Sequence, residues 1–401
     1  MIVSKSKEMI KKSFEKTVYE FTEIPELKLR DNFGIYIHVP FCYKKCSFCP
    51  FYKELFNRNL KEKYLKAIFT EINRTEYKSG PKWVYIGGGT PNTLNISELG
   101  AIIRCLQKKS KLRSIGIELL PSLLSREYIK GLKDIGFTKI SLGVESLSET
   151  VINKTDRTGL GKEKIKELVD YARTLNLWVN LDMMVGLPEQ IPEVFLNDIK
   201  NVSDIFPDQI TIYPYMIIRG QKPKGYMEDR IQFNLIEQAS KLLMPKGYSR
   251  KNVWVFAYGN DIYDSSGDEL VRDYLGFGPS AFSTFGNWKI VNPELKIYLK
   301  NFDNNKKMGL VAKNSKSSND WRRFAKMIYD LKCINQKELP FYISLFVLIL
   351  RLFGYSRNGH LTEKGRIFAH EITKTVVESL PFPIQNPNCI KNYNEYVSYS
   401  N

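Results

Sequence analysis

The 401-residue chain has no stretch of about 20 apolar residues, the length that a helix needs to cross a bilayer. Its first residues, MIVSKSKEMIKKSFEK, are charged without a following apolar run, so we expect no secretory signal there. Histidine is scarce, and His360 and His370 have no partner at metal-ligand spacing, so we interpret both as structural. Together these absences favour a cytoplasmic protein without a transmembrane segment.

The sequence also lacks a stripe of basic residues interleaved with aromatic ones, although it carries 60 Lys and Arg against 43 Asp and Glu, a net charge of +17. Scattered lysines argue against a nucleic-acid partner, whose binding needs a concentrated basic face. We therefore expect a solvated basic surface. An anionic substrate, an acidic electron donor or a peripheral contact with an anionic membrane remain as alternatives.

Cysteine is present in only six copies, but three of them fall within eight residues. Cys42, Cys46 and Cys49 form C-x3-C-x2-C in the segment YIHVPFCYKKCSFCPFYK. Three thiolates without a fourth ligand nearby suit a 4Fe-4S cluster bound through three irons, with the fourth iron open to a small ligand. A zinc knuckle short of one ligand, or three buried thiols, are the alternatives, and structural zinc sites close with four ligands. The isolated Cys105, Cys333 and Cys389 we interpret as structural.

Strand and helix patterns alternate from Ile35 onward. The expected strands are 35–39, 83–86, 115–119, 140–144, 179–185 and 210–213, and the helical patterns include 60–72, a helix capped by Ser97, 128–135, 165–175 and 194–206. Six such repeats in about 180 residues predict a parallel sheet with right-handed crossovers. The expected fold is α/β, a partial (β/α)6 barrel of the TIM type.

Polar residues stand where the active site of such a barrel lies, at the C-terminal ends of the strands. In chain order these are the cysteine loop, Gly87-Gly88-Gly89-Thr90, Glu118, Glu145, Asp182 and Tyr213. The glycines allow a close backbone approach and expose N–H groups, or form a plain tight turn. Glu118 and Asp182 are candidates for cofactor binding or for structural ion pairs. Tyr213 or Tyr215 is a candidate proton or hydrogen relay near the substrate.

The cysteine loop with its preceding strand and Pro40-Phe41, followed by Gly87-Gly88-Gly89-Thr90-Pro91, resembles the radical S-adenosylmethionine (SAM) superfamily. More narrowly it resembles the branch of oxygen-independent coproporphyrinogen III oxidase, which includes heme chaperones, anaerobic heme-degrading methyltransferases and class C radical SAM methyltransferases. The resemblance implies that the open iron chelates SAM, which is reductively cleaved to a 5′-deoxyadenosyl radical. It also implies a flavodoxin- or ferredoxin-type electron donor.

The resemblance assigns cofactor contacts residue by residue. Tyr36, Phe48, Gly88, Gly89 and Thr90 match positions near the cofactor, although Tyr36 and Phe48 also suit core packing. Arg157 matches an arginine that touches a second SAM, with a solvated loop arginine as the alternative. Glu145 departs from the oxidase pattern, since it stands in GVES where the oxidase has GVQS. Gly276 and Gly278 lie in a stretch that resembles the family's G-x-G-x-A-x-S loop near the mouth of the site.

Within the branch, CPFYK after the third cysteine looks like the methyltransferases, because the oxidase has another cysteine where Phe51 stands. The chaperone pattern, a His-Asn pair followed by Tyr-Trp, has no histidine in the corresponding region, which reads Asn252-Val253-Trp254. We therefore expect a class C-type methyltransferase that uses two SAM molecules to methylate an sp2 carbon of an unsaturated substrate. Quinones, tetrapyrroles, lipids and peptides are open as substrates. A coproporphyrinogen oxidase-like or heme-handling protein is the first alternative, and a nucleic-acid-binding protein is the second.

The expected domains are a helical lead-in at 1–33, the barrel at 34–230, a mouth-lining extension at 231–313, and a C-terminal winged-helix-like module with a tail at 314–401. The Ser, Asn and Lys run at 314–319 suggests a linker. The apolar run at 343–350, ISLFVLIL, predicts a buried helix of the C-terminal module, with a lid for a lipid-like or quinone-like substrate as the alternative.

Overall fold

The computed structural model describes residues 4, 7–9, 11, 18–26, 33–77, 80–217, 222–259, 273–331, 339–379 and 389–400. Contacts divide the chain into two units, each assembled from three stretches of sequence. The cysteine unit comprises Val18–Leu181, Arg272–Lys313 and Phe382–Asn401, and the helical unit comprises Met1–Thr17, Asp182–Val271 and Asn314–Pro381. These units do not coincide with the four contiguous domains expected from the sequence, because distant stretches of chain return to each unit.

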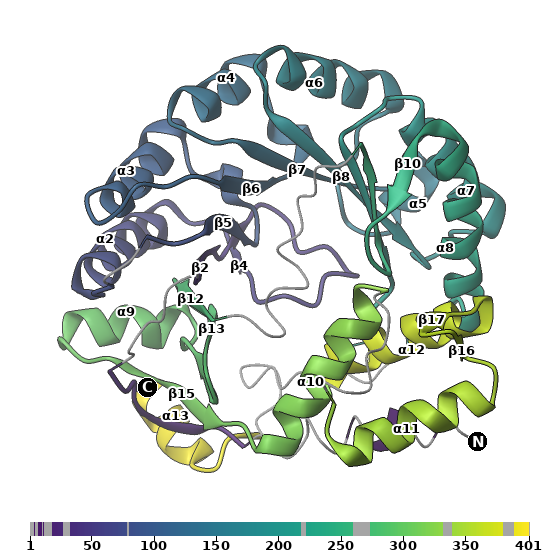
Figure 1. Ribbon diagram of the computed structural model, residues 1–401. Helices are drawn as coiled ribbons and strands as arrows, with labels where there is room; N and C mark the ends of the chain where they lie inside the picture. Colours follow the sequence, from purple (N-terminus) through teal and green to yellow (C-terminus); the bar gives the residue numbers. More distant parts are fainter. Residues whose placement is uncertain are drawn as a thin grey trace. The chain divides into compact units, whose positions relative to one another are not determined.

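Four parallel strands lie side by side in the cysteine unit, in chain order. They are β2 (Gly34–Val39), β5 (Trp83–Gly88), β6 (Ile115–Leu119) and β7 (Lys139–Glu145). The longer helices that follow them cover one side of this sheet (Figure 1): α2 (Arg58–Arg74), α3 (Ile96–Gln107), α4 (Arg126–Asp134) and α6 (Lys162–Thr174). In α2 the four-residue spacing of Tyr64, Ile68 and Ile72 buries all three against the sheet.

Two further predicted strands complete the set of six. β8 (Trp178–Val185) passes from the cysteine unit into the helical unit, and β9 (Gln209–Pro214) belongs to the helical unit. The predicted helix at 194–206 is α7 (Pro192–Ser203). All six predicted strands are therefore confirmed, because each is an apolar run that the structure buries almost completely.

The start of α3 differs from the prediction. Asn95, and not Ser97, is the N-cap: its side chain accepts a hydrogen bond from Glu98 N, and the Glu98 carboxylate accepts one from Asn95 N. This reciprocal pair is a capping box. Ser97 lies exposed in the first turn, so its prediction as the cap is wrong.

A second set of strands extends the sheet beyond β2. β12 (Tyr274–Phe277) pairs with β2 in parallel. The next strands in the sheet are β13 (Phe282–Phe285), β14 (Trp288–Val291), β15 (Met308–Lys313) and β1 (Glu20–Glu23), and each of them pairs antiparallel with the strand before it. The expectation of a helical lead-in is wrong for β1. There Phe21 is buried between exposed or half-exposed neighbours, the alternation of a strand.

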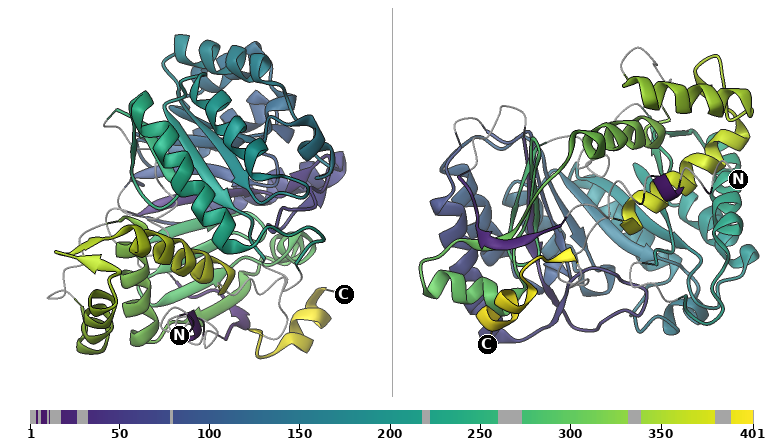
Figure 2. Two further views of the ribbon diagram at one scale, coloured as in Figure 1. Left: turned by 90° about the vertical axis from the view of Figure 1, so that its right-hand side faces the viewer. Right: turned by 90° about the horizontal axis from the view of Figure 1, so that it is seen from below.

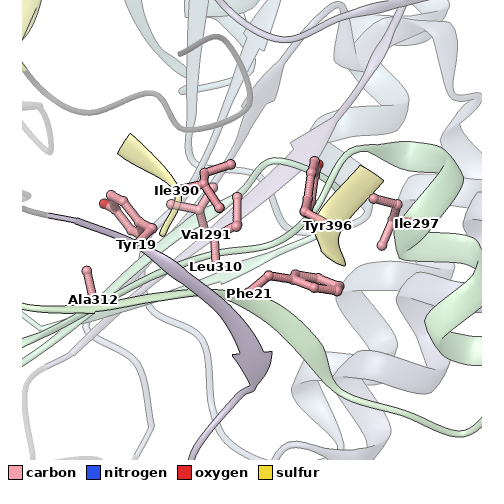
Figure 3. Close-up of a cluster of buried hydrophobic side chains, with 8 residues drawn as sticks. All are labelled: Tyr19, Phe21, Val291, Ile297, Leu310, Ala312, Ile390 and Tyr396. Carbon is pink, nitrogen blue, oxygen red and sulfur yellow. The ribbon is translucent and has the colours of Figure 1, made fainter. Parts of the chain in front are cut away.

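Residues in and next to β1 and residues near the C-terminus share one small core in the cysteine unit. Figure 3 shows its eight buried side chains: Tyr19, Phe21, Val291, Ile297, Leu310, Ala312, Ile390 and Tyr396. The right-hand view of Figure 2 places the purple strand β1 close to the yellow helix α13 (Tyr393–Ser400). The rings of Phe21 and Tyr396 meet edge to face with centroids 5.2 Å apart. Ile297 comes from α9 (Leu295–Asp303), which follows β14.

The helical unit contains a short antiparallel sheet and four long helices after α7. β9 pairs with β11 (Val255–Tyr258), which pairs with β10 (Tyr248–Arg250). The helices are α8 (Asp229–Leu243), α10 (Lys316–Tyr329), α11 (Phe341–Leu352) and α12 (Glu363–Ser379). The predicted linker at 314–319 is wrong in its second half, because Ser315 caps α10 through a hydrogen bond from Ser318 N.

The C-terminal part of the helical unit contains helices joined by a short hairpin. A hairpin of β16 (Ser356–Arg357) and β17 (His360–Leu361) joins α11 to α12. The prediction that 343–350 is helical is confirmed, but its burial is only half right. Ile343, Phe346, Val347 and Leu350 are buried, whereas Leu345 and Leu348 are 49% and 43% exposed.

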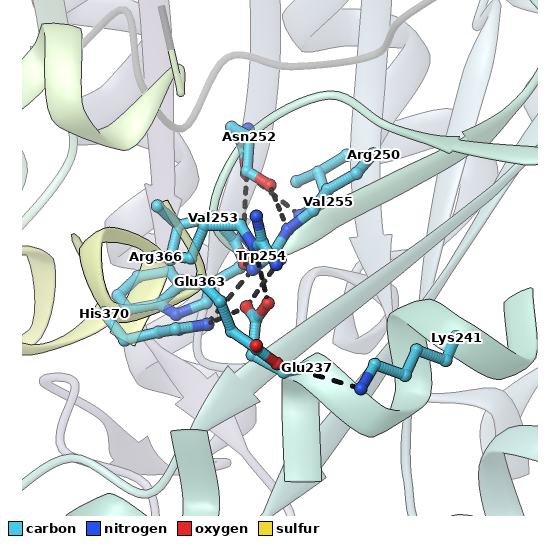
Figure 4. A network of polar contacts seen from close by, with 10 residues as sticks. All are labelled: Glu237, Lys241, Arg250, Asn252, Val253, Trp254, Val255, Glu363, Arg366 and His370. Carbon is cyan, nitrogen blue, oxygen red and sulfur yellow. Dashed lines mark hydrogen bonds and ion pairs between the residues drawn. The ribbon is translucent and has the colours of Figure 1, made fainter. Parts of the chain in front are cut away.

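A buried ionic network fastens α12 to α8 and β10 (Figure 4). The Glu237 carboxylate of α8 accepts hydrogen bonds from Arg250 at 2.6 Å and Arg366 at 2.8 Å, and lies 3.0 Å from His370 Nε2. Burial lowers the pKa of His370 to about 4, an effect that its bond to Glu237 opposes and Arg250 reinforces. Among the described residues, the contacts of His370 therefore hold α12 against α8.

No helix in the described part of the chain is long and apolar enough to cross a membrane.

Candidate functional site

The cysteine loop leaves the C-terminal end of β2 and is closed by a short parallel pair. β3 (Phe41–Cys42) pairs with β4 (Glu54–Leu55), and Phe56 N donates to Cys42 O at 2.9 Å. Cys49 N donates to Cys46 O at 3.3 Å, and Lys53 Nζ donates to Cys49 O at 2.6 Å. The loop thus presents its thiols from a backbone that is held by its own hydrogen bonds.

All three thiols are free, and Cys42 is buried. Burial raises the pKa of Cys42 to about 11, partly offset by the hydrogen bond that Thr90 donates to its sulfur at 3.3 Å. Burial also raises the pKa of Cys49, against the nearby charge of Lys53. Iron binds thiolates, so cluster binding at this loop would release protons.

The ligand set of the loop is consistent with a cubic cluster. Among the described residues, no group of three or more His, Cys, Asp or Glu side chains that could hold a single metal ion is found. A 4Fe-4S cube places each cysteine on a different iron, so its ligands do not converge on one point. The three free thiols and the absence of a fourth cysteine in the loop agree with this geometry.

The glycine loop lies directly against the strand that leads into the cysteine loop. Gly88 has φ +118°, and a Cβ there would meet Val39 O at 2.8 Å and the His38 ring at 2.9 Å. A Cβ on Gly89 would meet Phe41 O at 2.8 Å. Gly89 N donates to Val39 O at 2.8 Å, so this N–H is not exposed, contrary to our expectation. These glycines permit close backbone packing beside the cysteines.

Tyr36 and His38 share one face of β2, because strand residues two apart point the same way. His38 Nε2 lies 3.1 Å from Tyr52 O, and Nδ1 lies 3.1 Å from Tyr36 OH. Burial lowers the pKa of His38 to about 4, so the ring is neutral. A carbonyl can only accept, so Nε2 carries the proton and Tyr36 OH donates to Nδ1. Sequence reasoning missed His38, although its two-residue offset from Tyr36 was a signal.

Arg157 brings several predicted residues together beside the cysteine loop. Its guanidinium lies 3.4 Å from Glu145 Oε1, donates to Gly143 O at 2.5 Å, and lies 3.8 Å from Cys46 Sγ. The guanidinium carbon also lies 6.0 Å from the centre of the Phe48 ring. Burial would lower the pKa of Arg157, but Glu145, Cys46 and Glu118 together raise it. The alternative of a solvated loop arginine is wrong, since the side chain is only 13% exposed.

Two predicted carboxylates stand at the ends of β6 and β7. Glu145, the last residue of β7, has φ +65°, a conformation that costs a non-glycine residue energy. Its carboxylate faces Arg157, which itself lies beside the cysteine loop. The strained backbone at Glu145 therefore places a charged group near this loop. Glu118 lies beside the glycine loop, since a Cβ on Gly87 would be 3.3 Å from Glu118 Oε2.

The glycine-rich loop after β12 is anchored from behind by a buried carboxylate. Glu71 of α2 accepts hydrogen bonds from Gly278 N at 2.8 Å, Tyr298 OH at 2.5 Å and Asn292 Nδ2 at 2.8 Å. Gly278 has φ +91°, and a Cβ on Gly276 would meet Phe282 O at 2.2 Å. Gly276 at the end of β12 and Gly278 after it are both required for steric reasons. Sequence reasoning missed the anchor Glu71.

The remaining predicted residues belong to the helical unit. Asp182 lies half-buried on β8. Tyr213 meets Trp254 edge to face at 5.9 Å, and Tyr215 is 8% exposed. Burial raises the pKa of Tyr215, which makes its hydroxyl a poor acid. Asn252, in the stretch that we compared with the chaperone pattern, accepts hydrogen bonds from Trp254 N and Val255 N and so shapes the turn before β11 (Figure 4). Cys333 lies outside the described residues.

A family model matches the part of the chain that holds the candidate site. The chain matches the radical SAM superfamily over residues 36–202, the stretch that contains the cysteine loop and Arg157. The recognition made from the cysteine motif is confirmed by this match, and radical SAM domains imply a 4Fe-4S cluster and SAM.

The chain is similar to proteins of the coproporphyrinogen III oxidase-like branch. Heme chaperone HemW of Buchnera aphidicola subsp. Acyrthosiphon pisum is 25% identical over 365 residues, 84% of this chain and 96% of that protein. The oxygen-independent coproporphyrinogen III oxidase of Escherichia coli K12 is 27% identical over 302 residues, 67% of this chain and 65% of the oxidase. The solved structure of coproporphyrinogen III oxidase HemN from Escherichia coli, a radical SAM enzyme, has a TM-score of 0.75 at 23% identity and covers 90% of this chain and 96% of that one. The predicted α/β radical SAM fold with a helical C-terminal region is confirmed.

Proposed function

We propose that this protein is a radical SAM enzyme that acts on a tetrapyrrole. The observation that carries the proposal is the gathering of three free cysteines, Thr90 and Arg157 at one loop of a radical SAM domain. The substrate class rests on relatives named for heme and for coproporphyrinogen III, both tetrapyrroles. These relatives favour our first alternative over the class C methyltransferase that we expected from the sequence.

In this proposal Cys42, Cys46 and Cys49 hold the cluster. When bound, the cluster supplies the electron that cleaves SAM to a 5′-deoxyadenosyl radical. Thr90 donates a hydrogen bond to the Cys42 sulfur, which stabilises the thiolate form that iron needs. Arg157 places a positive charge next to the Cys46 sulfur.

The other residues position the cofactor and exclude water. Neutral His38 accepts a hydrogen bond from the Tyr36 hydroxyl, which fixes the direction of that O–H group on β2. The glycine loop and Glu118 flank this tyrosine and are candidates for contact with SAM, as are Phe48, Glu145, Asp182 and the loop of Gly276 and Gly278. Tyr213 and Tyr215 remain candidate relays. A ferredoxin- or flavodoxin-type donor would deliver the electron.

Methyl transfer is the second candidate, and one feature of the loop favours it. Phe51 stands where the oxidase pattern has a further cysteine, and its ring is 53% exposed. An oxidase-like reaction in this protein would therefore proceed without that thiol. A second SAM near Arg157 would serve as methyl donor in this case.

The test is product analysis after anaerobic reconstitution of the full chain. The protein is incubated with SAM and a strong reductant, with coproporphyrinogen III, with heme, or with neither, and 5′-deoxyadenosine and S-adenosylhomocysteine are quantified. Deoxyadenosine that rises with either tetrapyrrole supports the proposal, and an equal rise in S-adenosylhomocysteine adds methyl transfer. Heme binding without deoxyadenosine would point to a heme carrier. No response to either compound contradicts the substrate class.

The control is the variant Cys42→Ala with Cys46→Ala and Cys49→Ala. It should lose iron, sulfide and the brown colour of the reconstituted protein, and it should form no deoxyadenosine. Cys105→Ala is the matched control, because this thiol lies away from the loop and bonds to Asn73. A triple variant that keeps its iron and sulfide would refute the cluster assignment.

A further inference from the structure

Helix α11 carries an apolar face that the helical unit does not cover. Phe341, Leu345, Leu348 and Leu352 follow one another at the spacing that aligns side chains on one side of a helix. They are 84%, 49%, 43% and 75% exposed, and Tyr342 and Phe353 at the two ends are 43% and 55% exposed. We call these six residues the α11 face. An exposed apolar patch of this kind marks an interaction site.

The opposite side of α11 is firmly packed, so the exposed face is presented by a rigid element. Phe346 meets Trp321 and Phe324 of α10 with ring centroids 5.6 Å apart in each case, and Phe368 of α12 at 6.4 Å. Ile343, Val347 and Leu350 are buried on the same side. Rotating the helix to bury its outer face would expose these residues instead, so the exposed apolar surface would not become smaller.

The charges around this face select its partner. From 341 to 362 the chain has no Asp or Glu, while Arg351 and Arg357 are exposed. Lys364, also exposed, donates to Phe353 O at 3.0 Å and lies over the Tyr355 ring at 4.3 Å, which fixes its ammonium near the C-terminal end of α11. Of the two acids that flank this stretch in sequence, Glu338 lies outside the described residues, and Glu363 is paired with Lys241 at 3.8 Å. An apolar stripe bordered by cations is typical of helices that lie in a membrane interface.

We propose that the α11 face is a docking surface for an anionic lipid bilayer. The helix has 12 residues and so is about 18 Å long, too short to span a bilayer but suited to lying in its surface. Phe341, Leu345, Leu348 and Leu352 enter the acyl boundary, and Arg351, Arg357 and Lys364 meet lipid phosphates. A second copy of this chain is a poorer partner, because each copy carries a net charge of +17 and brings the same cations to the contact.

The test is co-sedimentation of the full-length protein with lipid vesicles. Vesicles of phosphatidylcholine containing phosphatidylglycerol are compared with vesicles of phosphatidylcholine alone, at low and at high salt. We expect binding at least about tenfold tighter to the anionic vesicles, weakened by salt. Failure to bind the anionic vesicles, or equal binding to both kinds, would overturn the proposal.

The variant Leu345→Glu with Leu348→Glu probes the face itself, and should bind at least about tenfold more weakly. Both side chains are exposed, so its melting temperature and circular dichroism should match the wild type. Met244→Glu is the matched control, since Met244 is a 60% exposed apolar residue of the same unit outside α11. A double variant that binds like the wild type would refute the proposal. A wild-type dimer that dissociates in the double variant, without vesicle binding, would assign the face to a second copy.

Discussion

At the scale of single residues, the candidate site depends on a buried ion pair next to the cysteine loop. Arg157 and Glu145 are 13% and 11% exposed at their side chains, and both stand in a network that includes Gly143 O and Cys46. Glu145 also holds a positive φ, so its carboxylate is positioned at a conformational cost. A buried charge of this kind is strongly destabilising once its partner is removed.

Arg157→Ala should therefore lower the free energy of unfolding by about 3 kcal/mol, because Glu145 loses its buried cation. Anaerobic urea denaturation measures this. The matched control is Arg126→Ala, which breaks an Arg–Glu pair of 57% and 37% exposure and should cost less than about 1 kcal/mol. Equal losses in the two variants would show that the Arg157 pair is solvated.

At the scale of elements, the first turn of α3 shows how a helix start is chosen. Asn95 and Glu98 satisfy each other's backbone N–H groups, and Glu98 also pairs with Lys61 of α2 at 2.6 Å. Ser97 has a good capping side chain at the wrong position, since α3 has already begun at Ile96. The reciprocal bond decides the cap, because it satisfies two backbone donors instead of one.

Asn95→Ala should lower the free energy of unfolding by about 1 kcal/mol, the usual cost of losing an N-cap. Ser97→Ala should leave it unchanged within about 0.5 kcal/mol, because Ser97 is exposed and makes no capping bond. Thermal denaturation of the two variants is the measurement. A larger loss in Ser97→Ala would place the helix start two residues later.

The junction of α8, β10 and α12 should make stability depend on pH. His370, with a pKa of about 4 against 6.5 for a free histidine, faces Glu237, Arg250 and Arg366. Between these values the unfolded chain takes up a proton that the folded chain does not. The contribution of His370 to the free energy of unfolding is therefore fully present above pH 6.5. It falls as the pH drops toward 4, by up to about 1.4 kcal/mol per pH unit.

Urea denaturation at several pH values in this window, for the wild type and for His370→Gln, isolates this contribution. The variant should be less stable at neutral pH but should lose less stability as the pH falls. The neutral, buried His38 acts in the same direction and remains in both proteins, so the slope should be reduced and not abolished. Parallel pH profiles would mean that His370 is already protonated in the folded protein.

At the scale of the whole molecule, β1 and the segment near the C-terminus are joined through one core. β1 pairs with β15, Tyr19 bridges to Ile390, and Asn392 exchanges hydrogen bonds with the Phe21 backbone. Tyr396 of α13 is 6% exposed and packs on Phe21, while its buried hydroxyl has no hydrogen-bond partner among the described residues. The last helix therefore stabilises the strand nearest the N-terminus by its ring and not by its hydroxyl.

Tyr396→Ala should cost about 3 kcal/mol in free energy of unfolding, the usual effect of removing a buried aromatic ring. Tyr396→Phe should be neutral or slightly stabilising, because it removes an unsatisfied buried hydroxyl. Calorimetry of both variants tests this. A loss in Tyr396→Phe comparable to that in Tyr396→Ala would show that the hydroxyl is bonded.

Local patterns in the sequence were enough to predict the class of protein and most of its strands and helices. The six strands and the main helices follow from short apolar periodicities, which reflect one side of each element facing a core. The cysteine spacing indicated the cluster, since its ligands lie within one loop. Periodicity did not reveal β1 or the strands beyond β12, where short segments pair with partners far away in the chain.

Only the tertiary structure could decide which distant groups meet. Arg157 lies beside Cys46 across 111 residues of sequence, Glu71 binds Gly278 across 207, and Glu237 meets His370 across 133. The apolar run in α11 likewise specifies a helix, but which of its faces is buried depends on how α10 and α12 pack against it. The sequence by itself therefore determined the local elements and the three-cysteine motif, because these depend on neighbouring residues. The partners of charged groups and the free surface of a helix are determined by the packing of the whole chain.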